Sequence, residues 1–456
     1  MEKETNHSFR LGTESVKDLL LEFSIPAIIG MVVNALYNIV DRIFIGKGVG
    51  QLAIGGVFVG LPLGVIAMAF AMLIGVGGNT LVSIKLGEGK KEEAEKILAH
   101  SLTLLLIVGV ALSIVGLLFL EPLLLAFGAT PANLPFALDY MRIIIYGAVF
   151  QILGFGMNNF IRGEGNPRIA MVTMLIGALI NTICDPIFIF VFKMGVKGAA
   201  LATIISQAVS AIWVMYYFLG GSSLLKIRLE DMKPDLAIVK EIFVIGFSPF
   251  SMQLAASMVM VLFNKSLNNF GGDMAISSMS VIQSITMMIL MPVFGINQGA
   301  QPLMGYNFGA KKYDRVKETL KYAAISASAI TVLGFLLIEI FPGQIFQLFL
   351  NDPRELEMIT RIGIPGMRIH LAAIGVVGFQ VIGGNYFQAT GKPKKAMILS
   401  LSRQVLILIP MLIVLPRLFN LGLTGVWLSG PISDILSTVL TALLLKQDIH
   451  ELNKSI

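Results

Sequence analysis

Repeated apolar runs, each long enough to cross a lipid bilayer, constrain this chain more than any other feature of its sequence. The first run, residues 24–46, has a proline near its start and an aspartate well inside it. A helix needs about 20 apolar residues to cross the hydrocarbon core, where its backbone polar groups must be satisfied internally. The chain is 55% hydrophobic and 14% charged, whereas soluble domains carry about 25% charged residues. The sequence therefore predicts an all-α integral membrane protein.

We read about a dozen helices from these runs, and several exceed the roughly 20 residues that a bilayer needs, so tilt or kinks are expected. The first 16 residues lack the apolar core of a signal peptide, so the first span is expected to be retained. The expected spans are approximately residues 19–46, 52–83, 94–120, 135–160, 168–192, 196–220, 239–269, 275–304, 316–341, 357–387, 395–416 and 422–445.

Basic residues mark one side of the expected topology. Lysines and arginines concentrate in the connections after spans two, four, six, eight and ten, on the same side as both termini. The positive-inside rule places that side in the cytoplasm and predicts a multi-pass protein of the cell membrane. This topology accounts for the net charge of +6, so we expect the lipid bilayer, and no nucleic acid, as a partner.

An internal repeat is the strongest architectural signal. Residues 162–167 (RGEGNP) return as residues 388–393 (QATGKP), and the Ser-Ile-Pro of residues 24–26 aligns with the Ser-Pro of residues 248–249. Each half has an even number of spans, so both halves enter the membrane in the same sense and are related by a pseudo-twofold axis along the membrane normal. We expect a first six-helix lobe over residues 1–220, a cytoplasmic linker over residues 221–238 and a second six-helix lobe over residues 239–456.

Two carboxylates inside spans form the candidate functional site. Counting at 1.5 Å per residue places Asp41 and Asp185 roughly 8–10 Å below the outer surface, with Thr203 at the same level. Asn181 lies one helical turn from Asp185, and Tyr37 one turn from Asp41. Such a cluster can share protons or bind a monovalent cation. A structural alternative remains for each carboxylate: Asp41 pairs with its neighbouring arginine, or Asp185 satisfies backbone groups freed by the proline that follows it.

The second half lacks this pair, because Asp41 aligns with Asn264 and Asp185 falls near Met411. Asp139 and Arg142 are expected to pair with each other at the outer edge. The roles of several other in-span charges stay undecided between function and structure, and these are Glu339, Arg368, His370, Arg403 and Asp434. The side chains expected to line a substrate cavity, with ordinary packing as the alternative for each methionine, are Met31, Asn34, Met68, Met171 and Met174.

No catalytic motif or cofactor site is visible. The chain lacks a Walker lysine loop, a His-Glu-x-x-His motif and the paired Asp-x-x-x-Asp of a membrane prenyltransferase. Cys184 is the single cysteine, so neither an intramolecular disulfide nor a cysteine metal site is predicted. We therefore expect no cofactor and an energy source in an ion gradient.

The chain resembles the multidrug and toxic compound extrusion (MATE) family over essentially its whole length. The first-half carboxylate pair is similar to the DinF-like and related prokaryotic branches, whereas Asn264 departs from the NorM-like pattern. The segments that carry the resemblance are residues 24–26, 37–46, 140–143, 162–167, 181–186 and 195–203.

The resemblance implies a V-shaped exporter of twelve helices with a central cavity, acting as a monomer. It implies that Asp41 and Asp185 couple transport to H⁺ or Na⁺, and that Pro26 is a hinge of the first span. It further implies that the coupling network is completed by Asn181, Thr203, Tyr37, Tyr140 and Asn158. If Na⁺ is the coupling ion, its ligands would come from Asp41, Asp185, Asn181 and Thr203.

The function that these observations predict is ion-coupled antiport of small amphipathic, often cationic, organic compounds. A lipid-linked oligosaccharide flippase of the same superfamily is the nearest alternative, and it would need more cationic residues facing the cavity. A membrane-embedded transferase is a second alternative, and it would need a metal–carboxylate pair facing the cytoplasm. A channel is a third, which an uphill-transport test would exclude. The sequence leaves open the substrate, the coupling ion and its stoichiometry, and the resting conformation.

Overall fold

A computed structural model describes residues 6–49, 51–221, 223–233, 235–347 and 353–454. Every regular element in these ranges is a helix. The first half contains α1 (Asn6–Thr13), α2 (Val16–Gly48), α3 (Gln51–Gly87), α4 (Lys91–Leu118), α5 (Leu120–Ala126), α6 (Leu134–Tyr146), α7 (Ala148–Gly163), α8 (Pro167–Pro186), η1 (Ile187–Val191) and α9 (Val196–Leu219).

The second half repeats this order after the short η2 (Leu229–Met232). Its helices are α10 (Leu236–Gly309), α11 (Tyr313–Ile340), α12 (Pro342–Gln347), α13 (Pro353–His370), α14 (Ile374–Ala389), α15 (Pro393–Leu401), η3 (Ser402–Leu408), α16 (Ile409–Val414), η4 (Leu418–Asn420) and α17 (Leu423–Lys454).

The expected twelve spans are present in the described part of the chain. Ten helical segments are long and apolar enough to cross a membrane, and two bent helix pairs raise the number to twelve if each pair is one span. The pair α6 and α7 bends by 52°, and the end of α13 bends by 44° against α14. The predicted all-helical membrane fold is therefore confirmed.

A glycine separates the seventh and eighth spans, which run on as the single element α10. Gly272 has φ 64° and ψ −164°, a backbone conformation that is readily available only to glycine. The break falls in a short polar and glycine-rich stretch, residues 268–273, which explains why residues 239–269 and 275–304 could be expected as separate helices.

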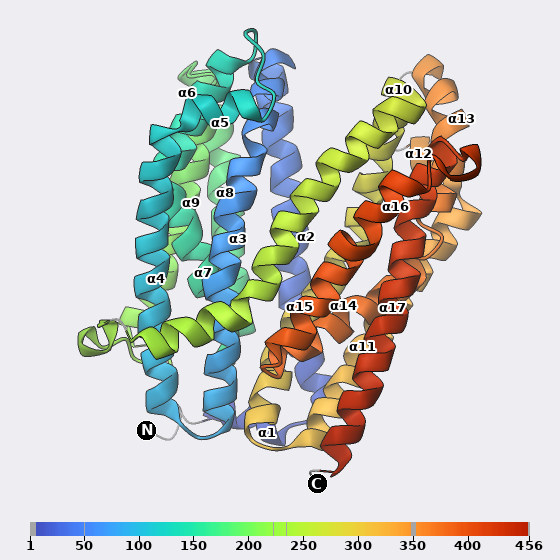
Figure 1. The fold of residues 1–456 in the computed structure, drawn as a ribbon. Helices are drawn as coiled ribbons and strands as arrows, with labels where there is room; N and C mark the ends of the chain where they lie inside the picture. Colours follow the sequence, from blue (N-terminus) through green and yellow to red (C-terminus); the bar gives the residue numbers. More distant parts are fainter. Residues whose placement is uncertain (1–5, 50, 222, 234, 348–352, 455–456) are drawn as a thin grey trace.

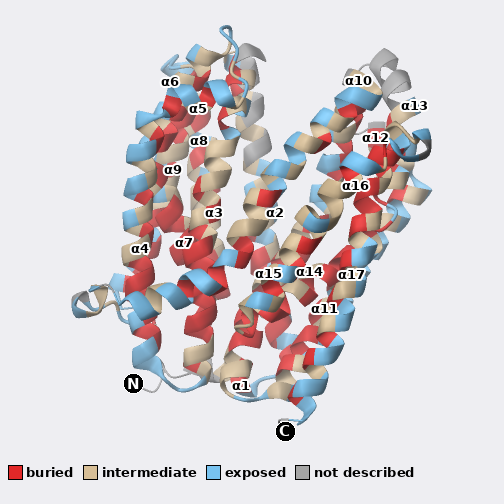
Figure 2. Cartoon of the chain, viewed as in Figure 1, coloured by how far each residue is buried: buried red, intermediate tan, exposed pale blue. Residues whose placement is uncertain are grey.

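The helices form two arms, which Figure 1 shows meeting at the end that carries both termini and diverging toward the other end. We call these ends the closed end and the open end. The first lobe consists of α3–α9 with α2 beyond Pro26, and the second lobe consists of α11–α17 with α10 beyond Pro249. Figure 2 shows buried residues running along the inside of each arm.

The two lobes exchange the starts of α2 and α10 at the closed end. Leu19 and Phe23, which precede Pro26, belong to a hydrophobic cluster of the second lobe. Ile242 and Ile245, which precede Pro249, belong to the hydrophobic cluster of the first lobe. Each half of the sequence therefore begins by packing against the other half, and it changes lobes near its repeated Ser-Pro site.

Glycines allow the lobes to approach closely at the closed end. A Cβ atom on Gly309 would collide with the carbonyl of Ile84, and one on Gly87 would collide with the carbonyl of Tyr306. Small residues are what allow helix backbones to come into such contact within a membrane. Gly77 similarly faces the carbonyl of Ile242. The glycine-rich residues 75–78 therefore serve helix packing.

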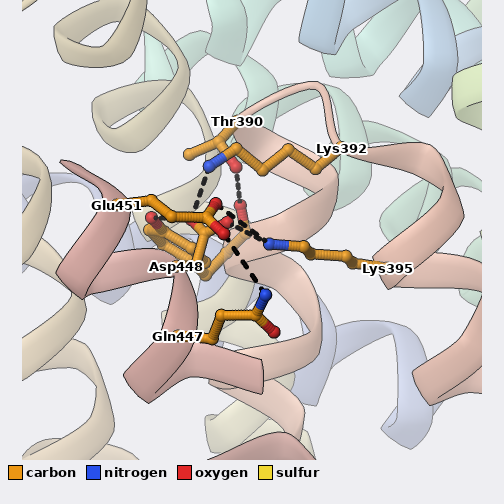
Figure 3. Close-up of polar contacts among 7 residues, drawn as sticks. Thr390, Lys392, Lys395, Gln447, Asp448 and Glu451 are labelled. Carbon is orange, nitrogen blue, oxygen red and sulfur yellow. Dashed lines mark hydrogen bonds and ion pairs between the residues drawn. The ribbon is translucent and has the colours of Figure 1, made fainter. Parts of the chain in front are cut away.

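A buried carboxylate anchors the closed end of the second lobe (Figure 3). Asp448 of α17 is fully buried and accepts a hydrogen bond from Tyr386 at 2.7 Å. Lys395 pairs with its other oxygen at 2.6 Å, and Lys392 pairs with the oxygen that Tyr386 contacts. These bonds fix the Gly-Lys-Pro turn between α14 and α15, the counterpart of the Gly-Asn-Pro turn of the first half, to the last helix. The carboxylate therefore has a structural role.

Candidate functional site

The two sequence-predicted carboxylates come from α2 and from the end of α8. Asp185 is the last residue before Pro186, and the chain continues from there as the π-turn η1, in which the N–H of Phe192 donates to the carbonyl of Ile187. Proline has no N–H and disrupts the regular hydrogen-bond pattern, and π-turns frequently occur at functional sites. The sequence thus interrupts this span directly beside the carboxylate.

Asp185 and Asp41 contact each other inside the first lobe. Asp185 is fully buried, and its carboxyl group is close enough to that of Asp41 for one hydrogen bond to join them. In the described part of the chain, neither oxygen of Asp185 accepts a hydrogen bond from an amide, a hydroxyl or a cationic side chain. Two ionised carboxylates in contact repel each other, and a shared proton or a bound cation relieves that repulsion.

Polar side chains of α8, α9 and α6 surround the pair. Asn181, buried one turn before Asp185, donates to the Thr203 hydroxyl at 3.4 Å, and Thr203 donates to the carbonyl of Ala199 at 3.0 Å. Tyr140 hydrogen-bonds to Thr203 and lies within electrostatic reach of Asp41 and Asp185. The structure therefore brings together the carboxylates, the amide, the hydroxyl and a phenol.

Tyr37 also lies within electrostatic reach of Tyr140, as expected for a residue one turn from Asp41 on α2. Asn158 is different. It is buried in α7, beyond the bend from α6. Its side-chain oxygen Oδ1 has no hydrogen-bond partner among the described residues. No described contact links Asn158 to the carboxylates, so its place in the network stays a prediction.

The predicted hinge lies between the two packing environments of α2. Pro26 is buried in the interior of this helix, between the part that packs on the second lobe and the part that carries Asp41. Proline removes one helix hydrogen bond, which weakens α2 at this position. Bending there stays a prediction.

The side chains predicted to line a cavity have varied surroundings. Asn34 is exposed on α2, whereas Met174 packs against Gly30 of the same helix. The sulfur of Met31 accepts a bond from Gln298 at 3.4 Å, which places Met31 at the boundary between the lobes. Met68 and Met171 are partly buried. Their contact with a substrate stays a prediction.

The site offers oxygen ligands but no cluster typical of a transition metal. Among the described residues, no group of three or more His, Cys, Asp or Glu side chains could hold a metal ion. The donors near Asp185 are carboxylate, amide and hydroxyl oxygens, which suit a hard monovalent cation as well as a proton.

One predicted ion pair is wrong. Asp139 pairs with Lys197 at 3.3 Å, and not with Arg142. Both partners are exposed, and the start of α9 brings Lys197 to Asp139 from another helix. The second lobe holds two in-span pairs that the sequence had left without partners: Arg368 with Glu339 at 3.2 Å and Arg403 with Asp434 at 2.8 Å.

A chain that spans the membrane many times, repeats a six-span unit and brings two carboxylates into contact inside one lobe has the construction of a membrane transporter. The MatE family model matches residues 26–187 and 249–414, once in each half. The chain belongs to this family of MATE transporters, as its sequence motifs predicted.

Relatives and solved structures agree with this assignment. The multidrug export protein MepA of Staphylococcus haemolyticus (strain JCSC1435) is 30% identical over 418 residues, which cover 92% of this chain and 90% of that protein. A MATE crystal structure in a bent conformation matches with a TM-score of 0.92 at 27% identity and covers 99% of each chain. One in a straight conformation matches with a TM-score of 0.91 at 28% identity, covering 98% of this chain and 99% of the other.

Proposed function

We propose that this protein is a secondary multidrug exporter that exchanges H⁺ or Na⁺ for small amphipathic, often cationic, organic compounds. The observation that carries the proposal is the contact between the carboxyl group of Asp185, which is fully buried, and that of Asp41, which is partly buried. Ionisable groups inside spans are rare, and they mark ion pathways in pumps and transporters. The multidrug export activity named for the MepA relative agrees with this proposal.

The coupling ion would act by favouring one conformation of the first lobe. An ion can shift a conformational equilibrium only through its different affinity for the two states, and the paired carboxylates supply that difference if their separation changes. Bending of α2 at Pro26 would move Asp41 relative to Asp185 and reshape the surface that carries Asn34. Solved MATE relatives with bent and straight conformations support two such states.

The orientation follows from loop charge. The closed end carries both termini and the basic connections, so we place it in the cytoplasm and the open end outside. In this arrangement the two lobes separate and meet alternately on the two sides of the membrane. The predicted boundaries, residues 1–220 and 239–456, differ from these lobes at the exchanged starts of α2 and α10.

Dye efflux tests the proposal directly. Cells or vesicles containing the native protein, Asp41→Asn or Asp185→Asn are given a pH gradient alone and then a sodium gradient alone. We expect native protein to extrude a cationic dye under one of the gradients, which identifies the ion. Both variants should fall to the background of protein-free membranes at normal expression, because an amide neither binds a proton in this range nor carries the charge that holds Na⁺.

Asp139→Asn is the matched control, because it removes a carboxylate of the same lobe that is exposed and paired with Lys197. It should extrude dye at the native rate. If Asp41→Asn and Asp185→Asn also pump at the native rate, the carboxylates are structural and the proposal fails. If native protein moves no cationic dye under either gradient, lipid-linked substrates become the better hypothesis.

A further inference from the structure

The second lobe contains a mid-membrane ion pair that the proposed coupling mechanism does not use. Arg403 lies near the middle of the span Pro393–Val414, and its Nε donates to Oδ1 of Asp434 in α17 at 2.8 Å. Neither residue has a charged counterpart at the equivalent place of the first half, where the repeat aligns Gly177 and Gln207. Such a pair adds little net stability over apolar packing, so stability alone gives a weak reason for its presence.

Both side chains of this pair are partly exposed on the surface of the protein. The side chain of Arg403 is 32% exposed and that of Asp434 is 14% exposed. A charged group exposed to hydrocarbon in the middle of a bilayer is very costly, and such groups therefore face a bundle interior or a water-filled cavity. Arg403 uses only its Nε in hydrogen bonds among the described residues, so its two terminal nitrogens are available as donors.

The backbone is built to hold Arg403 in this position. The π-turn η3 begins at Ser402, and its carbonyls are displaced from the regular helical pattern. The hydroxyl of Ser433 donates to the carbonyl of Arg403 at 2.6 Å, which joins the turn to α17 one residue before Asp434. The fifth span of each lobe thus has an ionisable residue at a π-turn: the acid Asp185 in the first lobe and a base in the second.

Aromatic and polar groups lie beside the pair. The ring of His370 contacts Phe263 and Trp427 edge-to-face at centroid distances of 5.4 and 6.3 Å. His370 is within electrostatic reach of both Arg403 and Asp434. Nδ1 of His370 and Oε1 of Gln404 are buried and make no hydrogen bond within the described ranges. The surroundings therefore combine a cationic donor with aromatic and uncompensated polar groups.

We propose that Arg403 binds an anionic group of the exported compound, and that Asp434 positions the guanidinium through its Nε. The substrate class is then an amphipathic aromatic zwitterion, with a carboxylate besides its cationic group. The two terminal nitrogens of an arginine form a planar fork that matches a carboxylate in a bidentate manner, which lysine cannot reproduce. This inference rests on the proposed export function and specifies its substrates.

A matched pair of dyes tests the assignment: rhodamine B, which has a free carboxylate, and its ethyl ester, which lacks the negative charge. Binding to purified protein is measured by fluorescence anisotropy without any ion gradient. The dissociation constant for the acid should be roughly tenfold higher for Arg403→Gln than for native protein, because the variant loses a hydrogen bond between charged groups. Ester binding should change less than twofold.

Arg368→Gln is the control variant, because it removes another arginine of the same lobe that pairs with an acid. It should leave the acid–ester difference unchanged. Arg403→Lys keeps the charge without the planar fork, and it should bind the acid with intermediate affinity even if Arg403→Gln fails to fold. Equal affinity of Arg403→Gln and native protein for the acid would overturn the assignment. Equal weakening of both dyes, or native-like acid binding by Arg403→Lys, would overturn it too.

The outcome is separable from that of the antiport proposal. Asp41→Asn should retain the acid–ester difference, since its site lies in the other lobe. A protein that discriminates the two dyes through Arg403 but extrudes neither under a gradient would refute coupled export and leave the anion site standing. If the Arg403→Gln protein binds the acid as tightly as native protein and still extrudes the ester under a gradient, the anion site is refuted and coupled export stands.

Discussion

At the scale of single residues, Glu164 is a buried carboxylate of the first lobe whose role is distinct from that of the coupling pair. Glu164 lies in the turn between α7 and α8, outside the spans, and is fully buried. Its Oε2 accepts bonds from the hydroxyl of Ser223 at 2.7 Å and the N–H of Leu225 at 3.3 Å. Burial raises the pKa of Glu164 to about 7, and the hydrogen bonds oppose this shift. The residue therefore joins the linker after α9 to the first lobe through a group that titrates near neutrality.

This shift predicts a pH dependence of stability. Because the pKa of Glu164 is higher in the folded protein than its ordinary value, its contribution is greatest below about pH 4.5 and is lost as the pH rises through about 7. The difference between these limits is roughly 3 kcal/mol. Glu164→Gln should flatten the fall of Tm between pH 5 and pH 9, measured by differential scanning fluorimetry in detergent. Glu92→Gln, which changes an exposed glutamate at the start of α4, should keep the native slope, and an unchanged slope for Glu164→Gln would contradict the prediction.

The sequence predicted those site residues whose positions depend on helix geometry alone. A rise of about 1.5 Å per residue sets the depth of Asp41, Asp185 and Thr203, so their common level could be counted before their helices were packed. Ion pairs between side chains of different helices were beyond this reasoning. Asp139 and Arg142 have the spacing of a same-helix pair, yet the packing of α9 supplies Lys197 instead.

At the scale of elements, the exchanged start of the chain fastens the lobes together. Arg315 donates to the carbonyls of Leu11 and Glu14 at 3.0 and 2.6 Å, and Asn307 also donates to Leu11 at 3.0 Å. Lys312 donates to the carbonyl of Gly12 at 2.8 Å. Side chains of the second lobe thus hold the backbone at the end of α1 and in the turn to α2, the helix that contains the predicted hinge at Pro26.

Arg315→Ala should loosen this attachment. Loss of charge-assisted hydrogen bonds to two carbonyls should cost about 1–3 kcal/mol and lower Tm in a thermal melt. The same variant should raise the proteolytic sensitivity of the first helix in native membranes. Lys321→Ala on the same helix is the control, because Lys321 is exposed and should have no effect. Native-like melting and proteolysis of Arg315→Ala would contradict this prediction. The apolar contacts of Leu19 and Phe23 would then be sufficient to hold the start of the chain on the second lobe.

The existence and extent of most spans followed from apolar length, but the exchange of helix starts did not. The aligned Ser-Pro sites at residues 24–26 and 248–249 marked where α2 and α10 are weakened. Which lobe each start packs against depends on the complementarity of two surfaces, and periodicity along one helix does not contain that information. The bends at Tyr146–Ala148 and His370–Ile374 could not be located from the sequence for the same reason, because packing between helices determines where these spans are broken.

At the scale of the whole molecule, the closed end must separate if the lobes alternate. The two lobes contact each other there through glycine-lined surfaces and through polar bonds such as Gln301 to Thr80, whose side-chain nitrogen and oxygen lie 3.1 Å apart. Backbone-to-backbone packing of this kind depends strongly on separation, so the contact is either made or lost. A compound entering from the cytoplasm would need it to be lost.

A covalent bridge across this contact should therefore stop transport reversibly. In a Cys184→Ala background, Thr80→Cys and Gln301→Cys place one thiol on each lobe, and a short bifunctional thiol reagent that forms cleavable disulfides should join them. We expect efflux of the bridged protein to fall to background and to recover after reduction, while either single-cysteine variant treated in the same way keeps its untreated rate. Efflux at full rate by quantitatively bridged protein would mean that substrates do not pass between the lobes at this end, and alternating separation of the lobes would have to be abandoned.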